Sequence, residues 1–239
     1  MLDHCQDIGS LLYPVCFIQT NNLWITLRYT RTMFTDALSL AYFLKLQTEL
    51  KPTISIEVGA FDADFSIEMA NAGRRGFICK AYAFEGSKPI FERYKDILEQ
   101  QNVTYINKII TDYEGTAEFL YDSNSDIFVG HNGIKTGRFD IKQSEVTECT
   151  TLDLYFRDLK DENIALWIDC EGANREVLTG ATKILSMCSS IYIEVEQEQL
   201  WQDAWLIDDV VRFLSDIGFV LKKSYQYSHN QSNLVFTRD

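Results

Sequence analysis

The segment Ile54–Ser66 constrains the fold of this chain more than any other part of the sequence. It follows Pro52, runs through five residues that are apolar except for Ser55 and Glu57, and then reaches Gly59. Beyond the glycine, apolar residues recur with helical spacing. The segment therefore predicts a strand, a tight glycine turn and a helix, which is how a doubly wound α/β domain begins. Such a turn presents backbone N–H groups and a helix N-terminus to a ligand, and a glycine lets the ligand approach closely.

The composition of this turn indicates the kind of ligand. A loop that holds a diphosphate has the pattern G-x-G-x-x-G, whereas this turn has one glycine, Gly59, and two carboxylates, Asp62 and Asp64. Carboxylates repel a diphosphate and attract a cation. S-adenosylmethionine carries a sulfonium and an ammonium group and no phosphate, so the turn predicts this cofactor. The alternative, a nicotinamide-dependent oxidoreductase on a similar sheet, requires a glycine-rich loop.

The rest of the chain alternates between strand and helix patterns. Together they predict an α/β fold with a doubly wound, Rossmann-like, seven-stranded and mostly parallel sheet whose last strand is antiparallel. We expect one cofactor-binding domain at residues 51–239 and an N-terminal cap at residues 1–50 that packs on it. Strands after the first are expected at 77–84, 103–110, 116–120, 146–149, 164–168, 191–195, 219–227 and 234–237, and later helices at 87–98, 151–159, 173–187 and 206–217.

Composition and charge argue against several classes of protein. Of the 239 residues, 46% are hydrophobic, which is enough to form a core. The formal net charge of −13 disfavours binding to nucleic acid or to an anionic membrane. No apolar run is long enough to span a membrane and no signal peptide is evident, so we expect a cytoplasmic protein. The six cysteines contain no C-x-x-C pair, which favours free thiols over disulfides or a zinc site.

An acidic residue stands at or near the end of each predicted core strand. The carboxyl ends of parallel strands meet at the ligand crevice, so these acids should converge there. Each has an expected role: Glu57 accepts from the methionine amino group, Glu85 from the ribose hydroxyls, and Asp112 from the adenine amino group. Asp169 is expected near the sulfonium or the acceptor. The acids are Glu57, Glu85, Asp112, Asp169 and Glu194.

Other interpretations of these polar residues remain open. An acid after a strand is often a helix N-cap or a solvated loop residue. For Glu85, which precedes a glycine at a strand-to-helix turn, binding is favoured. For Glu196 and Glu198 we expect a solvated face. His131 lies in a polar loop, where it is either a surface residue or a general base.

Several blocks of the sequence resemble the FkbM family of S-adenosylmethionine-dependent methyltransferases. Residues 56–66 are similar to the family's I-D-V-G-A-N-x-G-x-F-S, and residues 83–91 are similar to A-F-E-P-x-P-x-x-F. Residues 112–119 are similar to the segment after the family's third strand. The most specific block, residues 151–153 with 168–181, matches T-L-D…I-D-V-E-G-x-E-x-x-V-L-x-G-A, and Ile193-Glu194 follows it.

The chain departs from the family pattern at several positions, and in the most specific block Asn174-Arg175 stands in place of the expected single step to glutamate. Phe61 stands in place of asparagine, Ala63 in place of glycine, Gly86 in place of proline, and Trp167 in place of a common lysine. These departures leave open a second alternative, a catalytically degenerate protein that serves as a binding or scaffold domain. The acids at the main strand ends are intact, which favours an active enzyme.

The resemblance implies a class I methyltransferase architecture and methyl transfer to a hydroxyl group, commonly of a sugar or natural product. We therefore expect a small-molecule or glycan acceptor near the polar loop 121–144. Asp169 is the first candidate for the base that removes the hydroxyl proton, and His131 is the second. Asp169 and Glu194 are also candidates to hold Mg²⁺. The expected cofactor-binding residues are Glu57, Gly59, Ala60, Asp64, Phe84, Glu85, Gly86, Thr111, Asp112 and Asp169.

Overall fold

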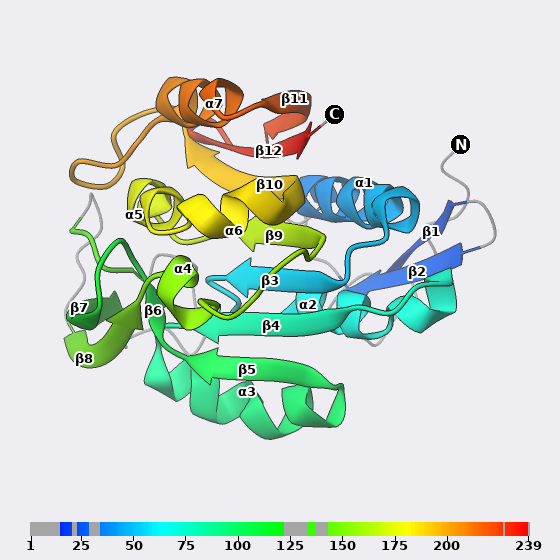
Figure 1. Ribbon diagram of the computed structural model, residues 1–239, viewed down its shortest axis with the longest axis horizontal. Helices are drawn as coiled ribbons and strands as arrows, with labels where there is room; N and C mark the ends of the chain where they lie inside the picture. The colour runs from blue at the N-terminus through cyan, green and yellow to red at the C-terminus, as the bar shows by residue number, and fades with distance from the viewer. Residues whose placement is uncertain are drawn as a thin grey trace.

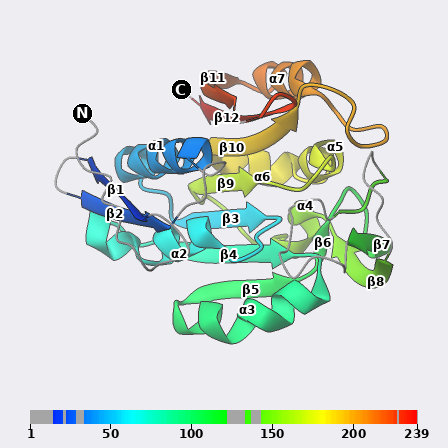
Figure 2. The same ribbon diagram turned by 180° about the vertical axis from the view of Figure 1, so that it is seen from behind.

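Seven strands form one continuous sheet through the middle of the molecule, as Figure 1 shows from one side and Figure 2 from the other. The computed structural model describes residues 15–20, 23–28, 34–121, 133–136, 143–226 and 228–238. The strand order is β11-β12-β10-β9-β3-β4-β5. The strands are β3 (Ile54–Val58), β4 (Lys80–Glu85), β5 (Val103–Asn107), β9 (Ile164–Ile168), β10 (Cys188–Glu196), β11 (Phe219–Gln226) and β12 (Gln231–Arg238).

The direction of the strands confirms the predicted topology. Strands β10, β9, β3, β4 and β5 pair in parallel, whereas β12 is antiparallel to both of its neighbours. The chain winds outward from β3 to β4 and β5 on one side and continues through β9 and β10 on the other. The winding therefore reverses beside β3, which places the expected ligand crevice at the carboxyl ends of β3, β4 and β9.

Helices cover both faces of the sheet (Figures 1 and 2). Apolar residues of α1 (Phe34–Leu50), α2 (Asp64–Ala70) and α3 (Lys88–Gln100) pack on one face, and those of α4 (Leu152–Tyr155), α5 (Asn174–Thr179), α6 (Thr182–Met187) and α7 (Ile207–Asp216) pack on the other. A short 3-10 helix, η2 (Ala72–Arg75), follows α2. Strands β4, β9, β10 and β12 thus bury alternate side chains in two different cores.

An aromatic cluster joins α1 to the sheet. The rings of Trp167 and Tyr192, on neighbouring strands, stack with their centroids 3.4 Å apart, and Phe43 of α1 lies against both. The Tyr192 hydroxyl is hydrogen-bonded to Ser39 of α1 at 2.9 Å. Trp167, which replaces a common lysine of the family pattern, therefore belongs to the core. Helix α1, at the end of the predicted N-terminal cap, packs directly on the seven-stranded sheet.

A second, smaller sheet explains why the predicted third strand, 103–110, is wrong in its length. The main-sheet strand β5 ends at Asn107, and the chain then forms β6 (Ile109–Ile110), which pairs with β8 (Gln143–Thr150). Strand β7 (Gly115–Tyr121) completes this sheet, and β1 (Val15–Thr20) and β2 (Leu23–Arg28) form a separate hairpin. Ile109 and Ile110 do not continue β5 in the main sheet, because they pair with β8, which is distant in sequence.

The predicted helix 173–187 is also wrong, because it is two helices. Helix α5 ends at Thr179 and α6 begins at Thr182. Gly180 lies between them, and a Cβ atom there would be 2.2 Å from the carbonyl oxygen of Thr111. The break at Gly180 lets the chain between α5 and α6 contact the backbone of Thr111. No helix in the described part of the chain is long and apolar enough to cross a membrane.

Candidate active site

The turn after β3 is held between the ends of the two neighbouring strands. Gly59 has φ +78°, and a Cβ atom there would lie 1.7 Å from the carbonyl oxygen of Asp169, at the end of β9. The backbone N–H groups of Gly59 and Ala60 both donate to the carbonyl oxygen of Phe84 on β4, each at 3.0 Å. Gly59 is required both for its backbone conformation and for this close approach. The predicted strand, turn and helix are confirmed.

The turn keeps a left-handed shape without the residues that favour it. Phe61 has φ +45° and Ala63 has φ +56°, at the positions where the family pattern has asparagine and glycine. A left-handed conformation costs a residue with a Cβ atom about 1–2 kcal/mol. Contacts offset this cost at Phe61: its carbonyl oxygen accepts a hydrogen bond from the Tyr105 hydroxyl at 2.7 Å, and its ring packs on Tyr94. The conformation is thus preserved although the sequence has changed.

Glu85, the predicted ribose acceptor, lies beside this turn. Its carboxylate accepts hydrogen bonds from the backbone N–H of Phe61 at 2.9 Å and of Ser87 at 2.7 Å. The residue is 5% exposed, and burial raises the pKa of the carboxyl from 4.5 to about 7 despite these two bonds. The carboxylate therefore joins the end of β4 to the turn after β3, where the predicted cofactor would place its ribose.

Glu57 has a structural bond as well as its predicted role. One oxygen of its buried carboxylate accepts the backbone N–H of Ser66 in the first turn of α2, at 2.8 Å. Burial, partly offset by bonds to Ser66, raises the pKa of this carboxyl to about 8. Glu57 therefore fixes the start of α2. A bond from Glu57 to the amino group of the cofactor stays a prediction.

Two further carboxylates of the turn suit a cationic ligand. Burial, and then the nearby charge of Asp64, raise the pKa of Asp62 to about 7. The pKa of Asp64 is raised too, first by burial and then by Glu68, although its side chain lies at the surface. A positive group beside this pair would stabilise the charged forms. The donors and acceptors around the turn therefore fit the adenosyl cofactor.

The structure gives three other expected cofactor residues local packing roles. Thr111 uses its hydroxyl within its own turn, bonding to the backbone of Tyr113 at 3.0 Å. Asp112 is exposed, and its Cα atom lies against Gly180, so it does not end a strand of the main sheet as predicted. Gly86 packs under the Phe119 ring, which a Cβ atom would meet at 2.5 Å. The small sheet therefore leaves no room there for the family's proline.

The predicted magnesium site is not supported. Among the residues that the structure describes, no group of three or more histidine, cysteine or acidic side chains could hold a metal ion. One Glu194 oxygen accepts a hydrogen bond from the Gln231 side chain at 2.8 Å. Asp169 follows β9 and donates its backbone N–H to Val58 at 2.9 Å. His131, the second candidate base, lies outside the described residues.

Glu171, which is half-buried, and Glu196, which is buried, form an acidic pair that the sequence interpretation missed. Glu196 was expected on a solvated face, but it is 1% exposed, because the loop that contains Trp201 folds over the end of β10. The indole N–H of Trp201 donates to Glu171 at 3.1 Å. Burial raises the pKa of Glu196 to about 7 and raises that of Glu171 well above its ordinary value. The clue in the sequence was a tryptophan only five residues beyond the strand.

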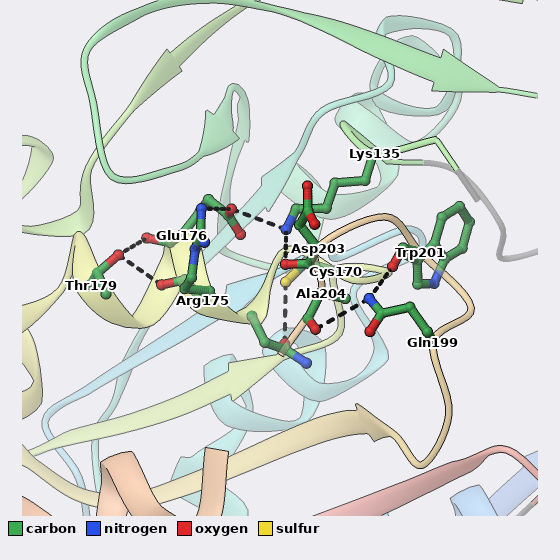
Figure 3. Close-up of polar contacts among 10 residues, drawn as sticks. Lys135, Cys170, Arg175, Glu176, Thr179, Gln199, Trp201, Asp203 and Ala204 are labelled. Carbon is green, nitrogen blue, oxygen red and sulfur yellow. Dashed lines mark hydrogen bonds and ion pairs between the residues drawn. The ribbon is translucent and has the colours of Figure 1, made fainter. Parts of the chain in front are cut away.

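A short segment of the predicted acceptor loop covers this pair. Lys135 forms an ion pair with Glu176 on α5 at 3.0 Å and donates to the carbonyl oxygen of Asp203 at 3.1 Å, as Figure 3 shows. Thr136 is bonded to Gln202 through both backbone and side chain. Residues 133–136 thus join the region beyond β7 to the loop after β10. This arrangement places residues 133–136 against Glu171, next to the turn after β3.

Comparisons with known proteins give one family match and several similar solved structures. Residues 57–221 match the Methyltransferase FkbM domain. Solved structures with a similar fold include a precorrin-6y C5,15-methyltransferase from Geobacter metallireducens GS-15, with 16% identity, coverage of 85% of this chain and 87% of that one, and a TM-score of 0.43.

A methyltransferase from Aquifex aeolicus, described as dependent on S-adenosylmethionine, has 11% identity, coverage of 88% and 100%, and a TM-score of 0.44. TehB from Haemophilus influenzae has 6% identity, coverage of 83% and 62%, and a TM-score of 0.47. The search of curated proteins gives no match. Because the domain match covers more than half of the chain, this protein belongs to the FkbM methyltransferase family and is an S-adenosylmethionine-dependent methyltransferase.

Proposed function

We propose that this protein transfers the methyl group of S-adenosylmethionine to a hydroxyl group of a sugar or glycan. The observation that carries the proposal is the turn after β3, where Gly59 abuts Asp169 and the Glu85 carboxylate is bonded to the Phe61 backbone. Glu85 and the acidic pair Asp62 and Asp64 would hold the cofactor, beside the turn at Gly59 and Ala60, whose backbone is fixed against β4 and β9. The cofactor would supply a methyl group on a positively charged sulfur, which is reactive without further activation.

The chemistry of the neighbouring side chains supports a hydroxyl acceptor. Carboxylates accept hydrogen bonds from hydroxyl groups, and they can take the proton that leaves during transfer. Glu171 lies in the turn that touches Gly59, Glu196 lies close enough to act on it through its charge, and Gly133 of the loop segment 133–136 contacts the Glu171 backbone. The net charge of −13 disfavours an anionic acceptor such as nucleic acid. A neutral polyhydroxyl compound matches these features.

The proposal also includes the domain boundaries and the cellular compartment of the protein. The catalytic domain comprises residues 51–239, and residues 1–50 form a cap, of which α1 contributes Phe43 to the aromatic cluster. The reaction takes place in a reducing compartment, the cytoplasm, which the free thiols of the described cysteines support. These are Cys79, Cys149, Cys170 and Cys188.

Methyl transfer from a labelled donor tests the proposed function. The purified protein is incubated with S-adenosylmethionine that carries a tritiated methyl group and with a panel of monosaccharides, methyl glycosides and amines. We expect tritium in a sugar and an equal amount of S-adenosylhomocysteine. Labelling of amines but not of hydroxyl compounds would replace O-methylation by N-methylation. Absence of binding to either adenosyl compound would support the scaffold alternative.

A further inference from the structure

Glu171 has a strained backbone at a position next to the cofactor turn. Its φ is +27°, a conformation that residues other than glycine adopt rarely and usually at functional sites. It lies in the turn between β9 and α5, two residues after Asp169. In the same turn, a Cβ atom on Gly59 would lie 3.4 Å from the Cα atom of Cys170. The Glu171 turn and the cofactor turn are therefore in van der Waals contact.

Glu171 is contacted from two sides, at its carboxylate by Trp201 and at its backbone and Cβ atom by Gly133. Trp201 donates its indole N–H to it at 3.1 Å, and hydrogen bonding by the same indole also lowers the pKa of Glu196. The indole sits on Gly172, where a Cβ atom would be 2.5 Å from it. On the other side Gly133 approaches closely, since its Cβ position is 3.6 Å from that of Glu171. Two glycines thus allow two loops to approach Glu171, and one of these loops bonds to its carboxylate.

Glu196 ends β10, the strand next to β9, and its charge acts on Glu171 in the turn after β9. Ile168 on β9 is in register with Ile193 on β10, and each acid follows its isoleucine by three residues. Glu196 is 1% exposed, and its Oε2 atom has no hydrogen-bond partner among the described residues. A buried carboxylate oxygen with no partner is unfavourable unless a proton or a ligand satisfies it.

The charges around Glu171 favour proton uptake. Asp169 in its own turn and Glu196 on β10 both raise the pKa of Glu171, after the larger effect of burial, while Trp201 opposes them. Lys135 lowers the pKa of Glu196, and its ammonium group is paired with Glu176. The pair therefore holds protons more tightly than ordinary carboxylates do, which suits a group that must receive one.

We propose that Glu171 is the general base that removes the proton from the acceptor hydroxyl, with Trp201 and Glu196 as positioning residues. This inference rests on the proposed function. In the step, the acceptor oxygen bonds to the methyl carbon, the methyl–sulfur bond breaks with its electron pair left on sulfur, and the hydroxyl proton moves to a Glu171 oxygen. Solvent then takes the proton from Glu171.

Glu171 fits the role of general base better than Asp169 and His131, the two candidates chosen from the sequence. Asp169 contributes its backbone carbonyl to the contact with Gly59 and its N–H to Val58, so its main-chain groups join β9 to the cofactor turn. His131 lies outside the described residues. Glu171 combines a strained backbone, a fixed carboxylate and contact with the predicted acceptor loop.

An alkylating cofactor analogue tests this inference without knowledge of the acceptor. An adenosine derivative with an aziridine in place of the sulfonium reacts with the nucleophile nearest to the transferred carbon. A carboxylate oxygen attacks the aziridine carbon, the carbon–nitrogen bond breaks, and the nitrogen takes up a proton, which leaves an ester on the protein. Peptide mass spectrometry then identifies the labelled residue. We expect the label on Glu171 in the wild-type protein.

Matched variants distinguish the loss of a reactive carboxylate from the loss of the folded structure. Glu171→Gln keeps an oxygen that can accept the Trp201 N–H, so it should fold and bind S-adenosylhomocysteine but lose the label. Glu198→Gln, which changes a carboxylate in the loop after β10, should keep it. Trp201→Phe and Glu196→Gln should slow labelling by about tenfold at saturating analogue, as the loss of one bond to a charged group implies. Trp205→Phe is the control for Trp201→Phe.

The outcomes distinguish this inference from the proposed function. A label on Asp169 or His131, or a protein that binds S-adenosylhomocysteine and carries no label on Glu171, would overturn the role of Glu171 alone. Failure of the wild-type protein to bind S-adenosylhomocysteine would contradict the proposed function, and this inference with it. Unchanged labelling rates in Trp201→Phe and Glu196→Gln would remove their positioning roles.

Discussion

Two groups of buried carboxylates lie at the carboxyl edge of the sheet, and the protein holds them in different ways. On the β4 side, both oxygens of Glu85 accept backbone N–H groups from nearby turns. On the β10 side, Glu171 is held by the side chain of Trp201, and one Glu196 oxygen has no partner in the described part of the chain. Burial raises the pKa of the carboxyls in both groups.

The difference indicates that the two groups of carboxylates have separate roles. Backbone donors cannot move away without unfolding the turn, so Glu85 fixes the shape of the cofactor site. Side-chain donors from distant loops can rearrange when an acceptor enters, and an unpartnered oxygen is ready to take a proton or a hydroxyl hydrogen bond. The first group is therefore a rigid frame, and the second suits proton transfer.

Gly59→Ala should have the largest effect on stability. The added methyl group would push apart the turn bonded to Glu85 and the turn that contains Glu171. A side chain there meets the Asp169 carbonyl and must adopt φ +78°, so we expect a loss of about 3 kcal/mol or more in the free energy of unfolding. Gly73→Ala is the control, since no atom lies within 4 Å of its Cβ position. Urea denaturation of both variants measures the difference. Equal stability of the two would show that the turns do not pack as described.

Glu85→Ala tests the rigid group. The variant removes an acceptor of two backbone N–H bonds at the predicted ribose position, so we expect affinity for S-adenosylhomocysteine to fall by about 100-fold. Isothermal titration measures the affinity, and Glu99→Ala on the exposed face of α3 is the control. Wild-type affinity in Glu85→Ala would mean that the frame does not hold the cofactor.

Glu196→Gln tests the second group through the pH dependence of stability. The pKa of this carboxyl is raised from 4.5 to about 7, so the stability that its proton provides is complete below pH 4.5 and is lost as the pH rises through 7. Glutamine mimics the protonated form. We therefore expect no change in stability near pH 4.5 and a gain of about 3 kcal/mol at pH 8.

Thermal denaturation of Glu196→Gln at both pH values provides the measurement, with Glu99→Gln as a solvent-exposed control. Destabilisation of Glu196→Gln by the same amount at low and high pH would indicate that Glu196, like Glu85, is fully bonded and belongs to the frame.

Lys135→Gln should have the smallest effect. It removes an ion pair whose side chains are only 11% and 10% exposed, but Arg175 still contacts Glu176 at 3.2 Å. We expect a loss of about 2 kcal/mol. Arg212→Gln, which removes an exposed pair with Asp209, should cost less than about 1 kcal/mol. If the two variants lose equal stability in urea, the 133–136 segment does not cover the acidic pair in solution.

The sequence predicted best what depends on neighbours along the chain. The strand before Gly59, the glycine turn and the position of Glu85 follow from short patterns, and all three are confirmed as structure. The end of the third strand was wrong because Ile109 and Ile110 pair with a strand more than thirty residues later. The burial of Glu196 depends on Trp201, whose loop path no local pattern specifies.

The central claim is that the turn after β3 binds an adenosyl cofactor, and isothermal titration of the wild-type protein tests it most directly. S-adenosylmethionine, S-adenosylhomocysteine and NADH are titrated separately into the same preparation. The account predicts binding of one molecule of either adenosyl compound per chain and no heat change with NADH. Binding of NADH alone, or of none of the three, would contradict it.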